Sequence, residues 1–171
     1  MKIPKPVTPE KDPYVISFSK VNLPNGWMAN MAPYPLLYEG KWYRSSEELF
    51  QCLRFEGHPS VQEEIRKHQS PTAFRRKAKT EEALVIRGQP LSREEDIRRM
   101  QLCLLLKLER YPKLKTLLLN TGRKRIVEET TARPSQPALF WGARWNPHTG
   151  AWEGNNALGE LWMNLRNHIA R

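Results

Sequence analysis

Glu47 has the position that acid–base or cation-stabilising chemistry requires. It lies in the segment WYRSSEELFQ at residues 42–51, in which the hydrophobic spacing predicts a helix. At about 100° per residue, Glu47, Gln51 and Arg54 fall along one edge of the apolar stripe of that helix. A polar edge beside a buried face often carries a site. An ordinary solvated Glu–Arg pair has the same spacing, so both interpretations stay open.

The neighbouring Glu48 has a structural explanation. Ser45-x-x-Glu48 fits a capping box, in which the serine and glutamate side chains bond backbone N–H groups at the helix start. We therefore predict that Glu48 stabilises the helix and that Glu47 is the candidate for chemistry.

A second segment, far downstream, is aromatic and interrupted by glycines. FWG at residues 140–142 leads to GNNALG at residues 154–159. Trp141 can stack on a base or a ribose face, or it can be an ordinary half-buried core tryptophan. A carboxylate facing a stacking platform would suit a nucleotide-like ligand.

An ordered set of short motifs runs from about residue 16 to the C-terminus. It comprises ISF at 16–18, MANM at 28–31, APYP at 32–35, GK at 40–41, SE at 46–47, FQ at 50–51, Phe55, SP at 70–71, LLLNTG at 117–122, VE at 127–128, WG at 141–142, and G-x-N-x-LG at 154–159. By this set the chain resembles the NADAR (YbiA-like) family of N-glycoside hydrolases. The key acidic residue of that family stands in a Ser-Glu pair, which corresponds to Ser46-Glu47.

The resemblance implies hydrolysis of an N-glycosidic bond through an oxocarbenium-like sugar cation. Glu47 would be the catalytic residue, which stabilises that cation, holds ribose hydroxyls or deprotonates the attacking water. Substrate-binding residues are expected at Asn30, Ser46, Gln51, Arg75, Lys79, Glu128, Trp141, Gly142 and Asn156. Among them, Arg75 and Lys79 would hold a diphosphate, and Glu128 would be either a supporting partner or a plain strand-end residue. No cofactor and no metal are expected.

The net charge bears on the choice of substrate. The chain has 28 Lys and Arg against 18 Asp and Glu, a net charge of +10. The charge is clustered at residues 74–79 and 123–125, with Arg98, Arg99 and Arg144 adding to it. These clusters are either solvated helix faces or contacts to a polyanion.

Relatives in the family act on phosphoribosylated intermediates of riboflavin synthesis or on ADP-ribosylated guanine in nucleic acid. The basic charge favours the second type, with DNA preferred over RNA. A DNA ADP-ribosyltransferase toxin is then an expected functional partner, with this chain as the antitoxin. The alternatives are the riboflavin-pathway activity and a non-catalytic module that binds ADP-ribose or nucleic acid.

Some positions depart from the family pattern. Ala143 follows Trp-Gly where many relatives carry Asp, and Ala78-Lys79 stands where they often have Gly-Arg. Ser92 replaces a frequent tryptophan, and residues 144–149 form an atypical insertion. These changes would alter the substrate, or remove activity and leave a binding module.

Composition predicts one domain over residues 14–171, preceded by a flexible basic, Pro-rich tail over 1–13. No apolar run nears the ~18 residues of a membrane span, and no signal peptide is evident. Cys52 and Cys103 lie on apolar helical patterns and are expected to be reduced, which suits the cytoplasm. The four histidines have no zinc-ligand spacing with the cysteines, and phosphate-loop and dinucleotide glycine motifs are absent from the sequence.

The periodicity predicts an α+β fold, a predominantly helical domain with a small β-sheet. Helices are expected at about 46–55, 60–68, 71–79, 92–110 and 112–120. A last helix places Leu158, Leu161, Trp162, Leu165 and Ile169 on one face. Residues 14–43 indicate strands and loops, 126–128 a short strand, and 129–155 a long loop.

Overall fold

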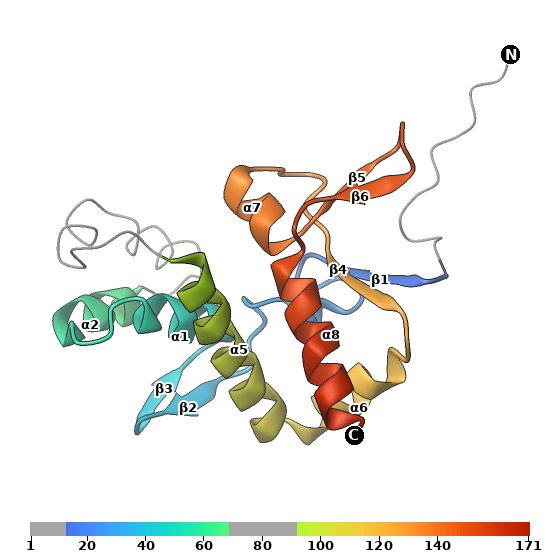
Figure 1. Ribbon diagram of the computed structural model, residues 1–171. Helices are drawn as coiled ribbons and strands as arrows, with labels where there is room; N and C mark the ends of the chain where they lie inside the picture. Colours follow the sequence, from blue (N-terminus) through green and yellow to red (C-terminus); the bar gives the residue numbers. More distant parts are fainter. Residues whose placement is uncertain (1–12, 69–91) are drawn as a thin grey trace, which may run out of the picture. The chain divides into compact units, whose positions relative to one another are not determined.

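The computed structural model describes residues 13–68 and 92–171, and the chain divides into two compact units (Figure 1). The first unit takes the residues up to Ala29 together with Lys113–Arg171, and the second takes Asn30–Pro112. Helices predominate, and short strands complete each unit, so the predicted α+β class is confirmed. The strands form three separate two-stranded pairs rather than one small sheet within the described ranges.

The second unit is a β-hairpin followed by helices. Strands β2 (Leu36–Tyr38) and β3 (Lys41–Tyr43) pair antiparallel across a two-residue turn. Helices α1 (Ser46–Leu53), α2 (Pro59–Lys67) and α5 (Arg93–Arg110) follow. Helix α1 packs against both α2 and α5, and every one of its residues is buried. The expected helix at 71–79 lies outside the described residues.

The predicted capping box at Ser45 is present in its serine half, and Ser92 caps α5 in the same way. Ser45 Oγ accepts the backbone N–H of Glu48 at 3.3 Å, and Ser92 Oγ accepts that of Glu95 at 3.4 Å. These bonds satisfy N–H groups that an α-helix leaves without an internal partner. They explain why α1 and α5 begin where the sequence predicts.

The first unit is built around one short parallel strand pair. Strand β1 (Val15–Phe18) pairs in parallel with β4 (Arg125–Glu128). The 3₁₀ helix η2 (Gly26–Met28) follows β1, and α6 (Pro112–Asn120) precedes β4. Helix α8 (Ala157–Ile169) lies on β4 (Figure 1). Trp162 of α8 is fully buried and donates its indole N–H to the carbonyl of Met28 at 3.1 Å.

The prediction of a loop over residues 129–155 is wrong in part. Helix α7 (Gln136–Trp141) and a hairpin of β5 (Arg144–Asn146) and β6 (Ala151–Glu153) form within it. The atypical insertion supplies β5 and the turn of this hairpin. The directly opposed Trp145 and Trp152 pack edge to face with ring centroids 5.5 Å apart. Such cross-strand aromatic pairs stabilise short hairpins. The proline and glycine content of the segment favoured the prediction of a loop instead.

The outer edge of β4 is closed by side chains and a loop rather than by another strand. Asn156 donates its Nδ2 to the Ile126 carbonyl at 2.8 Å and accepts the Glu128 N–H on Oδ1 at 3.0 Å. The Glu128 carbonyl accepts the N–H of Ala143 at 2.8 Å. One amide side chain thus does what two backbone groups of a neighbouring strand would do.

Gly159 allows α8 to approach β4 this closely. A Cβ at Gly159 would lie 2.3 Å from the Ile126 carbonyl oxygen. In an open helix position Gly→Ala stabilises by about 1 kcal/mol. At Gly159 we expect the opposite sign, a loss of about 1–3 kcal/mol, because the helix must move away from the strand. Urea denaturation of Gly159→Ala measures it.

The matched control is Asn164→Ala, an exposed position of the same helix. We expect it to change the free energy of unfolding by less than about 0.5 kcal/mol. A Gly159→Ala variant as stable as Asn164→Ala would mean that the close approach of α8 to β4 is not needed.

Candidate active site

Glu47 is a buried carboxylate at the start of helix α1. It is 6% exposed, and its backbone N–H donates to the Asn30 carbonyl at 2.9 Å. Gln51, one turn later, donates its Nε2 to Glu47 Oε1 at 2.8 Å. Glu47 also contributes, after burial, to raising the pKa of the Cys103 thiol on α5. Glu47 is buried, so the alternative of an ordinary solvated Glu–Arg pair is wrong.

Two residues next to Glu47 carry side-chain oxygen atoms without a hydrogen-bond partner among the described residues: Ser46, its neighbour in the chain, and Asn30, whose carbonyl accepts the Glu47 N–H. Ser46 is fully buried, and neither its Oγ nor the buried Oδ1 of Asn30 has a partner within the described part of the chain. A buried polar atom without a partner costs about 1–3 kcal/mol, so it indicates either strain or a ligand group. A hydroxyl-bearing ligand would satisfy both atoms.

The predicted polar edge of α1 continues beyond Gln51. Arg54 Nη1 donates to Gln51 Oε1 at 3.2 Å, and Arg54 Nε donates to Asp96 Oδ1 of α5 at 3.0 Å. Asp96 is 6% exposed and Gln51 2% exposed, so the chain from Glu47 to Asp96 is shielded from water.

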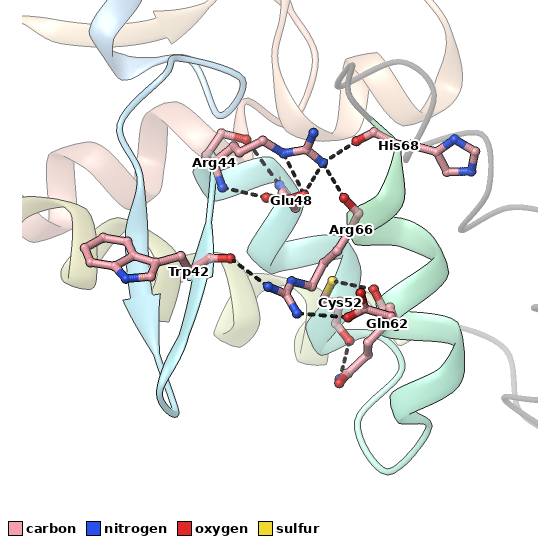
Figure 2. Close-up of polar contacts among 9 residues, drawn as sticks. Trp42, Arg44, Glu48, Cys52, Gln62, Arg66 and His68 are labelled. Carbon is pink, nitrogen blue, oxygen red and sulfur yellow. Dashed lines mark hydrogen bonds and ion pairs between the residues drawn. The ribbon is translucent and has the colours of Figure 1, made fainter.

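Glu48 has the structural role predicted for it. Its Oε2 accepts the backbone N–H of Arg44 at 2.5 Å, and its Oε1 accepts Arg44 Nε at 2.9 Å (Figure 2). Arg44 Nη2 also donates to the carbonyls of Arg66 and His68. Glu48 thus fixes the chain entering α1 to the end of α2.

A shallow hollow beside Glu48 does not qualify as the site. It is lined by Trp42, Arg44, Glu48, Glu63, Arg66 and Lys67. Its cations are already paired with acidic groups: Arg44 with Glu48, Arg66 with Glu63, and Lys67 with Glu64. Figure 2 shows the Arg44 side chain directed toward Glu48 and the carbonyl of His68.

The first unit brings together the other predicted residues that the structure describes. Gly142 is buried, and a Cβ there would lie 2.3 Å from the Glu128 carbonyl oxygen, so only glycine fits. Asn156 bonds the Glu128 N–H, and its own N–H donates to the Gly142 carbonyl at 3.1 Å. Asn156 is fully buried, so it positions Glu128 and Gly142 through the backbone. Its predicted contact with substrate stays a prediction.

Trp141 ends helix α7 and is half-buried. Its ring meets that of Phe140 edge to face, with centroids 5.0 Å apart. The predicted stacking of Trp141 on a base stays a prediction. Ala143, which replaces the family Asp, is fully buried and bonds β4 through its backbone. The substituted position thus belongs to the scaffold beside Glu128.

The predicted basic clusters differ in how they are neutralised. Arg75 and Lys79 lie outside the described residues. Arg99 pairs with Glu95 and Asp96, and Arg144 pairs with Glu153. The side chains at 123–125 are exposed, and across residues 13–68 and 92–171 they form no ion pair. Arg166 bonds Thr121 Oγ1 and the Lys124 carbonyl, which fixes the turn that carries them.

Lys107 is a functional candidate that the sequence analysis missed. It is fully buried on α5, and burial lowers its pKa from 10.5 to about 7. Its ammonium lies 4.9 Å from the centroid of the Tyr34 ring. The signal was present in the sequence, because Met100, Cys103, Leu104, Lys107 and Leu108 share the helical spacing of a buried face. Cys52 and Cys103 are buried and free, as predicted.

Comparison with known proteins identifies the family. The NADAR domain model matches residues 12–170. The N-glycosidases YbiA of Escherichia coli K12 and of Shigella boydii are each 30% identical to the chain over 91% of it and 89% of their own length. The NMR structure of E. coli YbiA superposes with a TM-score of 0.69 at 28% identity, covering 91% of this chain and 84% of that one.

The chain belongs to the NADAR family. The relatives are N-glycosidases by name, which confirms the prediction of a hydrolase for N-glycosidic bonds. No helix in the described ranges is both long and apolar enough to cross a bilayer.

Lys107 makes stability depend on pH. Because its pKa is about 7 when folded and 10.5 in the unfolded reference, the unfolded chain binds more protons between these values. Stability therefore rises with pH through this window, and the cost of the buried charge is full below about pH 7. We expect Lys107→Met to stabilise the protein at pH 6, and this advantage to shrink by about 2 kcal/mol at pH 9.

The measurement is urea denaturation of both proteins at the two pH values. Subtracting the variant removes the titration of the other groups. A difference in free energy that does not change with pH would show that Lys107 keeps its charge in the folded protein.

Proposed function

We propose that this chain hydrolyses the N-glycosidic bond between ADP-ribose and guanine in nucleic acid, with Glu47 as its catalytic carboxylate. The observation that carries the proposal is the buried Glu47 beside two oxygens, Ser46 Oγ and Asn30 Oδ1, that have no partner in the described residues. A ribose offers the hydroxyl donors that these atoms lack.

The chemistry follows from the charge that develops on the sugar. As the C1–N bond breaks, positive charge spreads over C1 and the ring oxygen, and the bonding electrons leave with the base. A carboxylate held in a low-dielectric site stabilises that charge more than water does. Glu47 then accepts a proton from the attacking water, whose oxygen bonds C1. The departing base takes up a proton from solvent, and Glu47 releases its proton to solvent, so one water is consumed in total.

The position of Glu47 suits this role. It lies in the first turn of α1, where the helix dipole favours a negative charge. The Gln51 amide donates to Oε1 of the carboxylate and so fixes its orientation. The Glu47 carboxylate is the group we assign to the sugar cation and the attacking water.

The nucleic-acid substrate is supported by charge. The exposed cluster at 123–125 makes no ion pair with the described residues, unlike Arg99 and Arg144. Together with the net charge of +10, this suits a phosphate backbone. On this basis we propose a DNA-repairing antitoxin role in the cytoplasm, opposite a DNA ADP-ribosyltransferase. The second candidate is hydrolysis of a phosphoribosylated riboflavin-pathway intermediate, and the third is a binding module without activity.

The decisive experiment compares Glu47→Gln with Glu48→Gln. We expect Glu47→Gln to lower the release of ADP-ribose from an oligonucleotide carrying ADP-ribosylated guanine by at least about 100-fold, as for loss of a general base. Glu48→Gln weakens only the contacts to Arg44, so it should cost roughly 0.5–2 kcal/mol of stability and leave turnover near that of the wild type. Wild-type turnover in a folded Glu47→Gln variant would refute the assignment.

A salt series separates the candidate substrates. If the cluster at 123–125 binds the nucleic-acid backbone, activity on the oligonucleotide should fall as the salt concentration rises. The slope of log activity against log salt concentration should be about −0.7 per phosphate contact on single strands. Activity on free guanosine-linked ADP-ribose should fall much less. Charge reversal of Arg123, Lys124 and Arg125 should lower oligonucleotide turnover selectively.

Parallel salt curves for the two substrates would make the basic surface a solubility feature. The phosphoribosylated metabolite would then become the leading substrate. Binding of ADP-ribose without turnover of either probe would favour the module without activity.

A further inference from the structure

Arg54 occupies the point where α1 is tied to α5. It stands at the C-terminal cap of α1, and its guanidinium lies 4.3 Å from the centroid of the Phe50 ring. Nε and Nη2 bond the two carboxylate oxygens of Asp96, with Nε to Oδ1 at 3.0 Å. The remaining terminal nitrogen, Nη1, donates to Gln51 Oε1 at 3.2 Å. A planar guanidinium held on two atoms has little freedom at the third.

The chemistry of the guanidinium decides the orientation of Gln51. Arginine has N–H donors and no acceptor, so only the oxygen of the Gln51 amide can face it. The amide nitrogen must then point the other way, toward Glu47, where it donates to Oε1 at 2.8 Å. With the amide reversed, its oxygen would face the carboxylate and its nitrogen would face the guanidinium. Both contacts would then be repulsive.

We propose that Arg54, held by Asp96, is a positioning residue that fixes the Gln51 amide and through it the carboxylate of Glu47. This rests on the proposed catalytic role of Glu47. Gln51 is 2% exposed and Glu47 6% exposed, so water has little access to replace the fixed contacts. A carboxylate that must meet a sugar cation needs its orientation set in advance, because misplacement by about 1 Å can cost 100-fold in rate.

Lysine would not perform this task equally. Its ammonium is a compact point charge on a flexible stem, and it cannot bond two Asp96 oxygens and Gln51 in one plane. Arg54→Lys keeps the positive charge opposite Asp96 and loses the planar set of N–H donors. Arg54→Met keeps most of the length of the side chain and removes both the charge and the hydrogen-bond donors.

A direct test follows the Gln51 side chain in the free protein by NMR. In the wild type, the Nε2 protons should be split in chemical shift and slow to exchange, since one is held by Glu47. In Arg54→Met we expect the exchange rate to rise at least about tenfold, with Arg54→Lys between the two. The matched control is Arg66→Met, because Arg66 bonds Glu63 and the Trp42 carbonyl rather than Gln51.

The kinetic test uses the oligonucleotide carrying ADP-ribosylated guanine. We expect Arg54→Met to lower kcat by about 10- to 100-fold, with KM changed by less than about threefold, because the loss affects the transition state. Arg54→Lys should recover part of kcat, and Arg66→Met should resemble the wild type. Circular dichroism melting of each variant separates a loss of orientation from a loss of fold.

The two readouts distinguish the positioning role from the proposed function. A Gln51 amide equally fixed in wild type and folded Arg54→Met overturns the positioning role, whatever the kinetics. Wild-type kcat in folded Arg54→Met also overturns it when Glu47→Gln is inactive. If Glu47→Gln keeps full turnover, or the wild type does not cleave the probe, the proposed function fails. The NMR comparison then still decides whether Arg54 orients Gln51.

Discussion

Burial of the Glu47 carboxylate is the constraint on which the arrangement of the second unit depends. An ion taken out of water loses several kcal/mol of hydration, which only fixed partners can offset. The unit provides them from three directions: the first turn of α1, the amide of Gln51, and the close packing of α5. Removing any of these would weaken the compensation of the buried charge, which disfavours a shift of α1 relative to α5.

The remaining charges of that unit fall into two groups. Arg54 and Asp96 form a shielded pair between helices, connected to the candidate active site through Gln51. Arg44 and Glu48 form a pair nearer the surface that fixes the entry of the chain into α1. Two adjacent glutamates therefore have separate roles. One bonds Gln51 and the other bonds Arg44, because successive helical residues point about 100° apart.

The first unit faces a different problem, the exposed edge of a strand pair. A two-stranded sheet is marginal by itself, and a bare edge leaves backbone groups without partners. Asn156 closes part of that edge with its side chain, and the chain at Ala143 closes the rest. Gly142 and Gly159 make the approach possible. The family motifs at 141–142 and 154–159 thus serve largely to hold the backbone around Glu128 in place.

Ala143, where this chain departs from the family pattern, is part of the closed edge of β4. A fully buried residue that bonds β4 through its backbone has no water to solvate a carboxylate side chain. The small residue agrees with its surroundings in this chain. The exposed cluster at 123–125, by contrast, is held by Arg166 and directed to solvent. Its charge is available to a polyanion.

The elements that can be predicted from the sequence are those with local signals. Ser45 and Ser92 mark helix starts, Pro112 begins α6, and helical spacing places Leu158, Leu161 and Trp162 on the buried face of α8. Local hydrogen bonds and side-chain periodicity suffice for these. The order of the short motifs along the chain was enough to predict the family. The hairpin of β5 and β6 was missed, since pairing of Trp145 with Trp152 is not visible in a segment rich in proline and glycine.

Which polar residues are buried, and with what partners, depends on how whole elements pack. Spacing aligned Glu47, Gln51 and Arg54, but a solvated ridge has the same spacing. Asp96 lies 42 residues from Arg54, and Asn156 lies 28 residues from Glu128. Lys107 has the spacing of the buried face of α5, but its full burial and its position 4.9 Å from the Tyr34 ring follow from packing. The packing of whole helices and strands brings such distant partners together. The roles of these residues therefore follow from the fold rather than from local spacing.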